Sequence, residues 1–128
     1  MEEINQPERH KYNCLFLPGL PGKIKRFSFF DDITDTGGKI YWLQYSGTYN
    51  NIGIDKFTID SSIHDIKESL DPLSKEGLPI LVIAYSYPTY LVNLVDFSDY
   101  PLVFGMSLFS PIHGLSSRYI REDFIKTH

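Results

Sequence analysis

The sequence has few of the features that most readily reveal a function. It contains a single cysteine, Cys14, which excludes an intrachain disulfide and fits a reducing compartment. It has no cysteine pair and no H-E-x-x-H motif, so we expect neither a metal site nor any other cofactor. The glycine-rich segment that ends at Lys23 does not match the G-x-x-x-x-G-K-[ST] pattern of a phosphate-binding loop, and nucleotide binding is therefore not favoured.

Blocks of like charge are also lacking. Lys and Arg total 12 and Asp and Glu total 16, which gives a formal net charge of -4 without local runs. No basic footprint for nucleic acid results from this pattern. The first ten residues are polar and contain no apolar core of the kind found in a signal peptide, so we expect a cytoplasmic protein.

Long hydrophobic runs are limited to two uncharged segments, 78–95 and 100–117. Each is just long enough to raise the question of a membrane span, which needs roughly 20 apolar residues. Proline interrupts both segments, and tyrosine, serine or asparagine recur in them. The first is better explained as a buried strand, a turn and a helix, and we expect no membrane span.

What the sequence does contain is sufficient for one packed domain. Its 128 residues are 42% hydrophobic and 15% aromatic, and we expect a single domain over 1–128 with residues 1–10 as a flexible N-terminus. Apolar runs alternate with amphipathic stretches. Strands are predicted at Tyr12–Leu17, Lys39–Tyr45, Ile80–Ala84 and Leu102–Phe109, and helices at Lys23–Asp32, Ile59–Leu70, Thr89–Phe97 and Ser116–Lys126. This alternation predicts an α/β fold, a three-layer sandwich in which helices cover both faces of a small, mainly parallel sheet.

The helix over Ile59–Leu70 has the clearest pattern. Apolar residues at 59, 63, 66 and 70 form one stripe at helical spacing, and Asp60, Ser61 or Ser62 can serve as the N-cap. Asp71-Pro72 and the segment 76–79 (E-G-L-P) are predicted to end this helix, because proline is unfavourable in a helix interior.

The segment around Ser86 is the most informative part of the chain. An apolar run ends at a small residue, one serine follows, and apolar spacing then resumes, which is typical of a strand that turns sharply into a helix and exposes a serine hydroxyl. In the G-x-S-x-G motif of such turns, glycines stand where this chain has Ala84 and Pro88. Pro88 either forces Tyr87 into an extended conformation or occupies the first turn of the helix, where its missing N–H costs little.

Three motifs in this order resemble those of the α/β-hydrolase superfamily. The segment 17–22 (L-P-G-L-P-G) resembles the H-G-x-P-G loop, 45–48 (Y-S-G-T) resembles the D-x-R-G-x-G loop, and 84–88 (A-Y-S-Y-P) resembles the nucleophile elbow. The resemblance covers nearly the whole chain but only the N-terminal half of the family's core. It implies a four-stranded sheet of order 2-1-3-4.

The same resemblance implies roles for individual residues. Ser86 would be the catalytic nucleophile, and the backbone N–H groups of Leu20 and Tyr87, next to the turn at Gly19, would bind the developing oxyanion. The catalytic acid and histidine of the family come from strands beyond those present here. Of the four histidines, only His113 is predicted at the same sheet edge as Ser86, where it is either a substitute base or an exposed turn residue.

Two functions remain open from the sequence. The first is a serine hydrolase of the esterase or thioesterase type with an incomplete triad, acting on a small acyl or ester substrate. The second is a non-catalytic pseudohydrolase that serves as a protein-interaction or oligomerisation module. In that case the last strand, Leu102–Phe109, would be an open edge that pairs with a second copy or with a complementary subunit, which would also allow His113 or His128 to act in trans.

Overall fold

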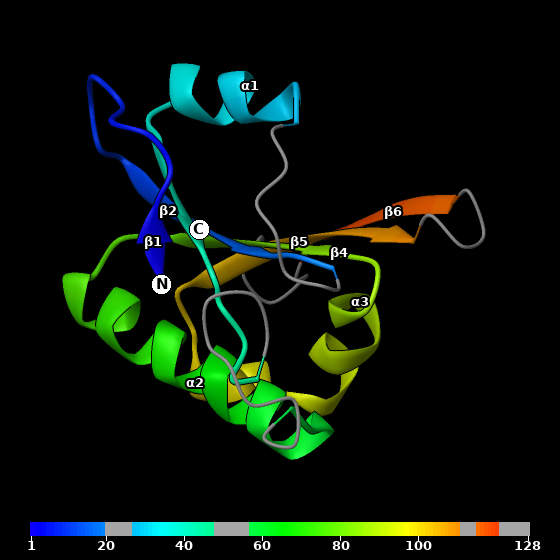
Figure 1. Ribbon diagram of the computed structural model, residues 1–128. Coiled ribbons are helices and arrows are strands. Elements are labelled where there is room, and N and C mark those ends of the chain that lie inside the picture. Colours follow the sequence, from blue (N-terminus) through cyan, green and yellow to red (C-terminus); the bar gives the residue numbers. More distant parts are fainter. Residues whose placement is uncertain (20–26, 48–56, 111–114, 121–128) are drawn as a thin grey trace.

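The computed structural model describes residues 1–19, 27–47, 57–110 and 115–120. A single sheet separates one helix on one face from the remaining helices on the other (Figure 1). The strands are β1 (Glu2–Glu3), β2 (Tyr12–Leu17), β3 (Gly38–Trp42), β4 (Ile80–Tyr85), β5 (Val103–Ser110) and β6 (Leu115–Ile120). The helices are α1 (Phe29–Asp35), α2 (Ile59–Glu76) and α3 (Pro88–Leu91), with 3-10 turns η2 (Val92–Leu94) and η3 (Phe97–Asp99). The chain is thus an α/β three-layer protein.

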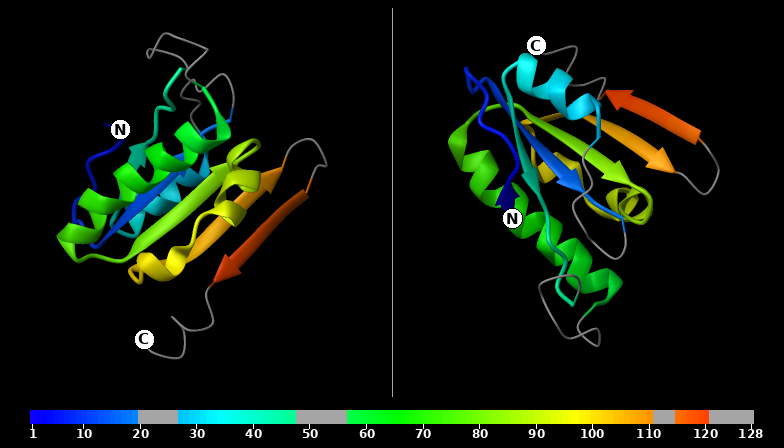
Figure 2. Two further views of the ribbon diagram at one scale, coloured as in Figure 1. Left: turned by 90° about the horizontal axis from the view of Figure 1, so that it is seen from below. Right: turned by 45° about the horizontal axis from the view of Figure 1, so that its top comes forward.

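The sheet has six strands in the order β1-β3-β2-β4-β5-β6. The four central strands are parallel, and their order corresponds to the predicted 2-1-3-4 arrangement. The predicted four-stranded sheet is nevertheless too small, because an antiparallel strand is added at each edge (Figure 2). All four central strands therefore end at the same edge of the sheet, which is where ligands bind in open α/β sheets.

Residues 115–120 form a strand and not the start of the predicted helix over Ser116–Lys126, whose residues 121–126 lie outside the described part of the chain. Residues 115–120 form β6 and pair antiparallel with β5, from Ser110↔Leu115 to Gly105↔Ile120. An edge strand has unpaired N–H and C=O groups, and a following segment that turns back can satisfy them with a short connection. The prediction that the fourth predicted strand forms an open edge is therefore wrong.

The N-terminal residues lie along β3, at the side of the sheet opposite β6. β1 pairs with β3, and Asn5 donates hydrogen bonds from Nδ2 to the carbonyl of Gly38 (2.9 Å) and to Thr34 Oγ1 (2.6 Å). Its Oδ1 accepts from the N–H of Ile40 (2.7 Å). Residues 1–10, for which the sequence predicts a flexible segment, thus make specific contacts with the sheet and with α1.

Two apolar cores lie on the two faces of the sheet. Alternate residues of β2 face opposite sides, with Cys14 and Phe16 on the α1 side and Leu15 and Leu17 on the α2 side. α1 covers β2 and β3 on its face, while α2 and α3 cover the other face (Figures 1 and 2). The largest fully buried side chains are Trp42, Tyr45, Phe16 and Phe30. Burial on both faces explains why the central strands are continuous apolar runs.

α2 begins and ends differently from the prediction. Its N-cap is Thr58, whose Oγ1 accepts from the N–H of Ser61 while Ser61 Oγ accepts from the N–H of Thr58, a reciprocal capping box. The helix continues through Pro72 to Glu76, so the predicted end at Asp71-Pro72 is wrong. Gly77 is the C-cap, so the end signal predicted in the segment 76–79 is confirmed. Continuation buries Leu73 beside Leu70 in the core, and this burial offsets the hydrogen bond that proline cannot make.

Three other boundaries differ. α1 begins at Phe29 instead of Lys23, although residues 23–26 lie outside the described part of the chain. β3 ends at Trp42 rather than Tyr45. The predicted helix over Thr89–Phe97 is the single turn α3 followed by two 3-10 turns. None of the helices in the described ranges is long and apolar enough to cross a membrane.

Candidate functional site

Ser86 occupies a strained turn directly after β4. Its φ is 68°, and it is the one non-glycine residue with positive φ in the part of the chain that the structure describes. A side chain in this left-handed region costs about 1–2 kcal/mol. The turn is secured by its N–H, which donates to the carbonyl of Phe109 on β5 (2.7 Å). The surrounding sheet thus holds Ser86 in a conformation that it would not adopt alone, which is typical of functional sites.

The helix begins immediately after the serine. Tyr87 has helical angles (φ -48°, ψ -49°), and Pro88 is the first residue of α3. Thr89 donates to the carbonyl of Ser86 from its N–H (3.0 Å) and its hydroxyl (2.6 Å). Pro88 therefore occupies the first turn, the second of the two alternatives that the sequence left open, and Tyr87 remains helical. The local geometry is strand, strained serine, helix.

The N–H of Tyr87 lies at the start of this turn. Thr89 and Tyr90 are the first residues to donate back, to the carbonyls of Ser86 and Tyr87. The N–H groups at a helix start have no acceptor within the helix. The amide of Tyr87 therefore lies at the N-terminal end of α3, directly after Ser86.

Gly19, which follows β2, comes very close to the serine turn. A Cβ atom built on Gly19 would lie 3.1 Å from the Cβ of Ser86, 3.2 Å from the carbonyl oxygen of Tyr85 and 3.5 Å from its ring atom Cδ1. Glycine permits this close approach because it has no side chain. The structure thus brings Gly19, Ser86 and Tyr87 together, whereas Leu20 lies outside the described residues.

Aromatic rings flank the serine on the α2 face. The rings of Tyr45, Phe57 and Tyr87 contact one another with centroid distances of 5.4–6.2 Å. Burial raises the pKa of Tyr45 well above its ordinary value, and the nearby Tyr87 and Asp65 add to the effect. The Tyr45 phenol therefore stays protonated at neutral pH.

A second aromatic group flanks the serine on the α1 face, and sequence reasoning missed it. Its members are Phe27, Phe29, Tyr85 and Phe109, which we call the aromatic quartet. They come from the α1 region, β4 and β5, so no local spacing relates them. The one available signal is that Phe109 ends a predicted strand and Tyr85 directly follows another.

The histidines that the structure describes are bonded to other residues, His10 to Asn13 and His64 to Glu68. His10 precedes β2, whose six residues span about 20 Å, and it therefore lies at the opposite edge of the sheet. His64 is two-thirds exposed on α2 and lies 3.0 Å from Glu68, one helical turn further on. His113 and His128 lie outside the described residues.

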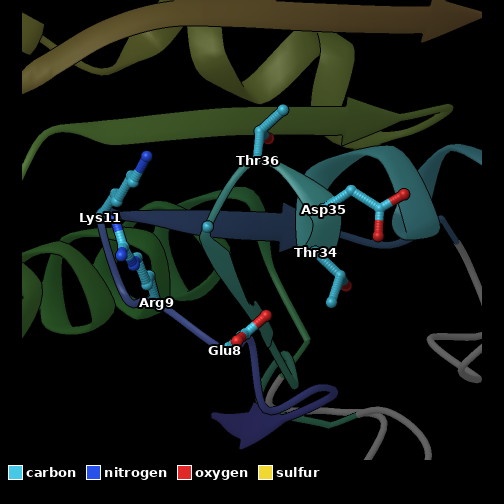
Figure 3. Close-up of a pocket in the computed structure, with 7 residues that line it drawn as sticks. Glu8, Arg9, Lys11, Thr34, Asp35 and Thr36 are labelled. Atoms are coloured by element: carbon cyan, nitrogen blue, oxygen red, sulfur yellow. The ribbon is translucent and has the colours of Figure 1, made fainter.

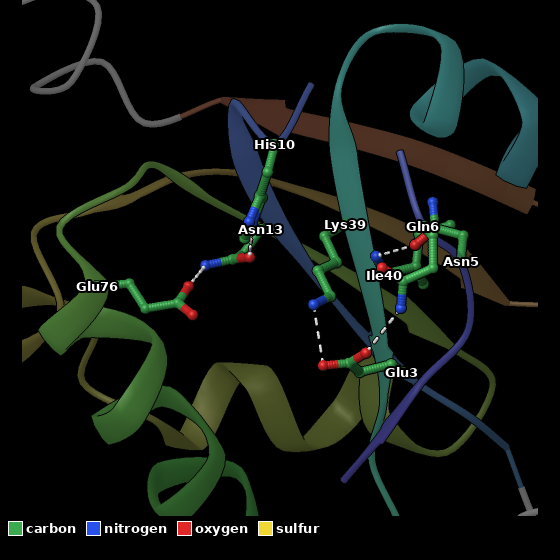
Figure 4. A network of polar contacts seen from close by, with 8 residues as sticks. All are labelled: Glu3, Asn5, Gln6, His10, Asn13, Lys39, Ile40 and Glu76. Atoms are coloured by element: carbon green, nitrogen blue, oxygen red, sulfur yellow. Dashed lines mark hydrogen bonds and ion pairs between the residues drawn. The ribbon is translucent and has the colours of Figure 1, made fainter. Parts of the chain in front are cut away.

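Polar side chains at the opposite edge are paired with one another. Asn13 is fully buried; its Oδ1 accepts from Nε2 of His10 (2.5 Å), and its Nδ2 donates to the carboxylate of Glu76 (Figure 4). Buried polar groups are stable only when they are hydrogen-bonded in this way. The arrangement ties the start of β2 to the end of α2.

A pocket of about 230 Å³ lies at the same edge (Figure 3). It is formed by the segment before β2 and the turn after α1, and both signs of charge line it, with Arg9 and Lys11 opposite Glu8 and Asp35. Most small-molecule sites are larger and mainly apolar. Within the described ranges, no group of three or more His, Cys, Asp or Glu side chains could hold a metal ion.

Comparisons with known proteins add no relative. No family model matches the sequence, and no curated protein and no solved structure matches it. The fold and the serine turn therefore define only a class, an α/β protein with a strained serine between strand and helix.

Proposed function

We propose that this protein is a serine hydrolase of the α/β-hydrolase type that acts on esters or thioesters, with Ser86 as the nucleophile. The observation that carries the proposal is the positive φ of Ser86 at the end of β4. A nucleophile elbow needs this conformation to present its hydroxyl at the rim of the sheet. A serine without such a role would be replaced at little cost by glycine, which adopts positive φ freely.

Two further features support the proposal. The sheet order places the end of β2 beside the end of β4, so Gly19 and Ser86 share one edge. Tyr87 has helical angles despite the following proline, and in the proposed reaction its N–H binds the oxyanion.

The proposed reaction has two steps. Ser86 Oγ attacks the acyl carbon, its proton passes to a base, and the bond to the leaving alcohol or thiol breaks as that group takes up a proton. Water then cleaves the acyl-serine by the same route, releasing the acid and restoring the hydroxyl. The base must be supplied for either step; His113 remains its predicted source in the same chain.

Fluorophosphonate labelling tests this proposal. Ser86 Oγ would displace fluoride and form a bond to phosphorus, and intact mass would show one adduct. We expect the adduct in the wild type and in Ser98→Ala, which removes an exposed serine from η3, and none in Ser86→Ala. Absence of an adduct on the folded wild type, under conditions that label a known serine hydrolase, would refute the proposed activity.

The alternative is a non-catalytic interaction module. It is favoured by the partners of His10 and His64, which are bonded to Asn13 and Glu68. In this case β6 is the strand through which the sheet would pair with a second copy or a complementary subunit, since it is the outer strand on that side. Analytical ultracentrifugation tests this, because pairing through β6 predicts a dimer and a lone monomer contradicts self-association.

A further inference from the structure

The pocket of about 230 Å³ at the amino ends of the parallel strands is lined by charges of both signs. Arg9 and Lys11 lie on one side of it, in the segment before β2, and Asp35 lies on the other, at the end of α1 (Figure 3). Glu8 adds a second carboxylate. Unlike the bonded Asn13 at the same edge, none of these four side chains forms an ion pair or a hydrogen bond within the described part of the chain. The pocket therefore holds two cationic and two anionic groups that do not pair with one another.

Backbone contacts hold the two sides of this pocket together. Gly37, which follows α1, has a φ of 87°, and its carbonyl accepts from the N–H of Lys11 (2.8 Å). A Cβ atom built on Gly37 would lie 2.6 Å from the carbonyl oxygen of Arg9 and 2.9 Å from Cγ of Lys11. Glycine thus lets the segment that carries both cations lie directly against the turn after α1. The position of the basic side relative to Asp35 is therefore set by the main chain.

A second, apolar pocket adjoins the charged one. It has a volume of about 250 Å³ and is lined by Lys11, Tyr12, Pro79 and Phe104, so Lys11 is common to both pockets. The rings of Tyr12 and Phe104 meet edge to face, with their centroids 6.1 Å apart. Tyr12 Oη also lies 2.7 Å from Oγ1 of Thr36, a residue of the charged pocket. A ligand in the charged pocket can therefore place an apolar group beside these rings, where its burial is favourable.

The charges define the class of ligand. A simple anion would be attracted by Arg9 and Lys11 but repelled by Asp35, and a simple cation would meet the reverse. A zwitterion satisfies both sides, because arginine donates paired N–H groups to a carboxylate and a carboxylate accepts from an ammonium group. The pocket is smaller than most small-molecule sites, which limits the charged part of the ligand to a few atoms. An α-amino acid carries both charges next to one carbon atom and projects its side chain from that atom.

We propose that the two pockets form a binding site for a free α-amino acid with an apolar side chain. Arg9 and Lys11 bind its carboxylate, and Asp35 binds its ammonium group. Its side chain lies against the rings that line the apolar pocket. The site is at the opposite end of the parallel strands from Ser86, so the proposal does not depend on the function proposed for that serine.

Titration of the full chain with L-phenylalanine, followed by ligand-observed NMR, tests the site. We expect saturable binding that Asp35→Asn and Arg9→Gln each weaken at least about fivefold. Asp32→Asn is the matched control, because it changes an exposed carboxylate of the same helix outside the pocket, and it should keep the wild-type affinity. All three side chains are exposed, so the variants should fold, which their urea midpoints can verify. Absence of saturable binding, or equal weakening by Asp35→Asn and Asp32→Asn, would overturn the proposal.

Three analogues test which groups of the ligand are recognised. N-acetyl-L-phenylalanine lacks the ammonium charge, L-phenylalaninamide lacks the carboxylate, and L-alanine lacks the aromatic side chain. Each should bind at least about tenfold more weakly than L-phenylalanine. Asp35→Asn should not weaken binding of the N-acetyl compound further, and Arg9→Gln should not weaken binding of the amide further, because the group that each residue binds is already absent. Wild-type affinity for the amide or for the N-acetyl compound would indicate a site for a peptide terminus and would overturn the proposal.

Discussion

At the amino ends of the parallel strands polar side chains are paired with one another, whereas at the carboxyl ends the backbone holds a serine in a conformation suited to glycine. The Asn13 amide is buried and bonded on both sides by His10 and Glu76. Ser86, at the other edge, has a positive φ, and its neighbours are rings that remain partly exposed.

The two ends of the parallel strands therefore contribute differently to stability and to function. Hydrogen bonds at the amino edge connect the N-terminal segment, β2 and α2, and so contribute to stability. Strain and exposed apolar surface at the carboxyl edge reduce stability and are retained where a ligand or a reaction makes use of them. Changes at the amino edge should therefore lower stability, and changes at the carboxyl edge should affect labelling while sparing or improving stability.

Gly38→Ala should have the largest effect on stability. A Cβ at Gly38, the first residue of β3, would lie 2.4 Å from Ile33 Cγ2 and 2.5 Å from Tyr12 Cζ, so neighbouring side chains must move. Overpacking of this kind costs about 3 kcal/mol of unfolding free energy, measurable by urea denaturation. Gly77→Ala is the matched control: its φ is 79°, but nothing lies within 4 Å of the added Cβ, and we expect a loss of about 1 kcal/mol. Equal losses in the two variants would show that crowding is not the cause.

Asn13→Ala should have the second-largest effect on stability. The change removes two hydrogen bonds and leaves a small cavity in a fully buried position, and we expect a loss of about 2 kcal/mol in the free energy of unfolding. Asn93→Ala, which alters an exposed asparagine on η2, should cost less than about 0.5 kcal/mol. Fluorophosphonate labelling should persist in both. Loss of labelling in folded Asn13→Ala would contradict the separation of the two edges.

Ser86→Gly should raise the free energy of unfolding, in contrast to the two changes above. Relief of the left-handed strain, less the greater entropy that glycine loses on folding, predicts a gain of about 0.5–1 kcal/mol in stability. Labelling should be lost completely. Ser86→Ala is the control, because it loses labelling as well but keeps the strain and should leave the unfolding free energy nearly unchanged. A fall in stability in Ser86→Gly would indicate that the serine side chain stabilises the turn.

The ion pair between Glu3 on β1 and Lys39 on β3 should give the smallest effect. The hydrogen bond between the two side chains (2.9 Å) lowers the pKa of Glu3. The pair therefore stabilises the fold above the pKa that Glu3 has in the unfolded chain, and this stability is lost as pH falls through the lower pKa in the folded protein. The difference in thermal midpoint between wild type and Glu3→Gln should be small at pH 7, smaller in high salt, and absent near about pH 2. Glu8→Gln changes an exposed carboxylate of the same segment and should show no comparable loss on acidification. A difference that persists at low pH would mean that Glu3 acts through packing.

Much of the fold is local enough to be predicted from sequence. β2 and β4 are short apolar runs bounded by turn residues, and both were placed within one residue. The end of α2 was not, because the helix-breaking tendency of Pro72 is outweighed by burial of Leu73, and burial is a property of the assembled core. β6 was predicted as a helix for a similar reason: its strand conformation depends on the free edge of β5 and not on its own pattern.

In the candidate site, too, local motifs could be predicted and tertiary contacts could not. Ser86, Tyr87 and Gly19 come from two short motifs next to strands, so the sequence predicts them as site residues. The sheet order places them together. The aromatic quartet needs the register between β4 and β5 and the position of α1, neither of which any local pattern encodes. The base for Ser86 stays a prediction, because the described histidines are bonded to Asn13 and Glu68.

The all-parallel centre of the sheet also has a consequence for the rate of folding. β2 pairs with β4, which lies far along the chain. The parallel pairings of β2 with β3 and of β4 with β5 also require a long crossover connection. Chains dominated by such distant pairings fold in roughly milliseconds to seconds, whereas a hairpin such as β5–β6 closes in about 1–10 μs. The β5–β6 hairpin is therefore expected to form and break many times before β4 arrives beside β2, and docking of α2 onto those two strands, not the hairpin, should limit the rate at which Ser86 is drawn into its turn.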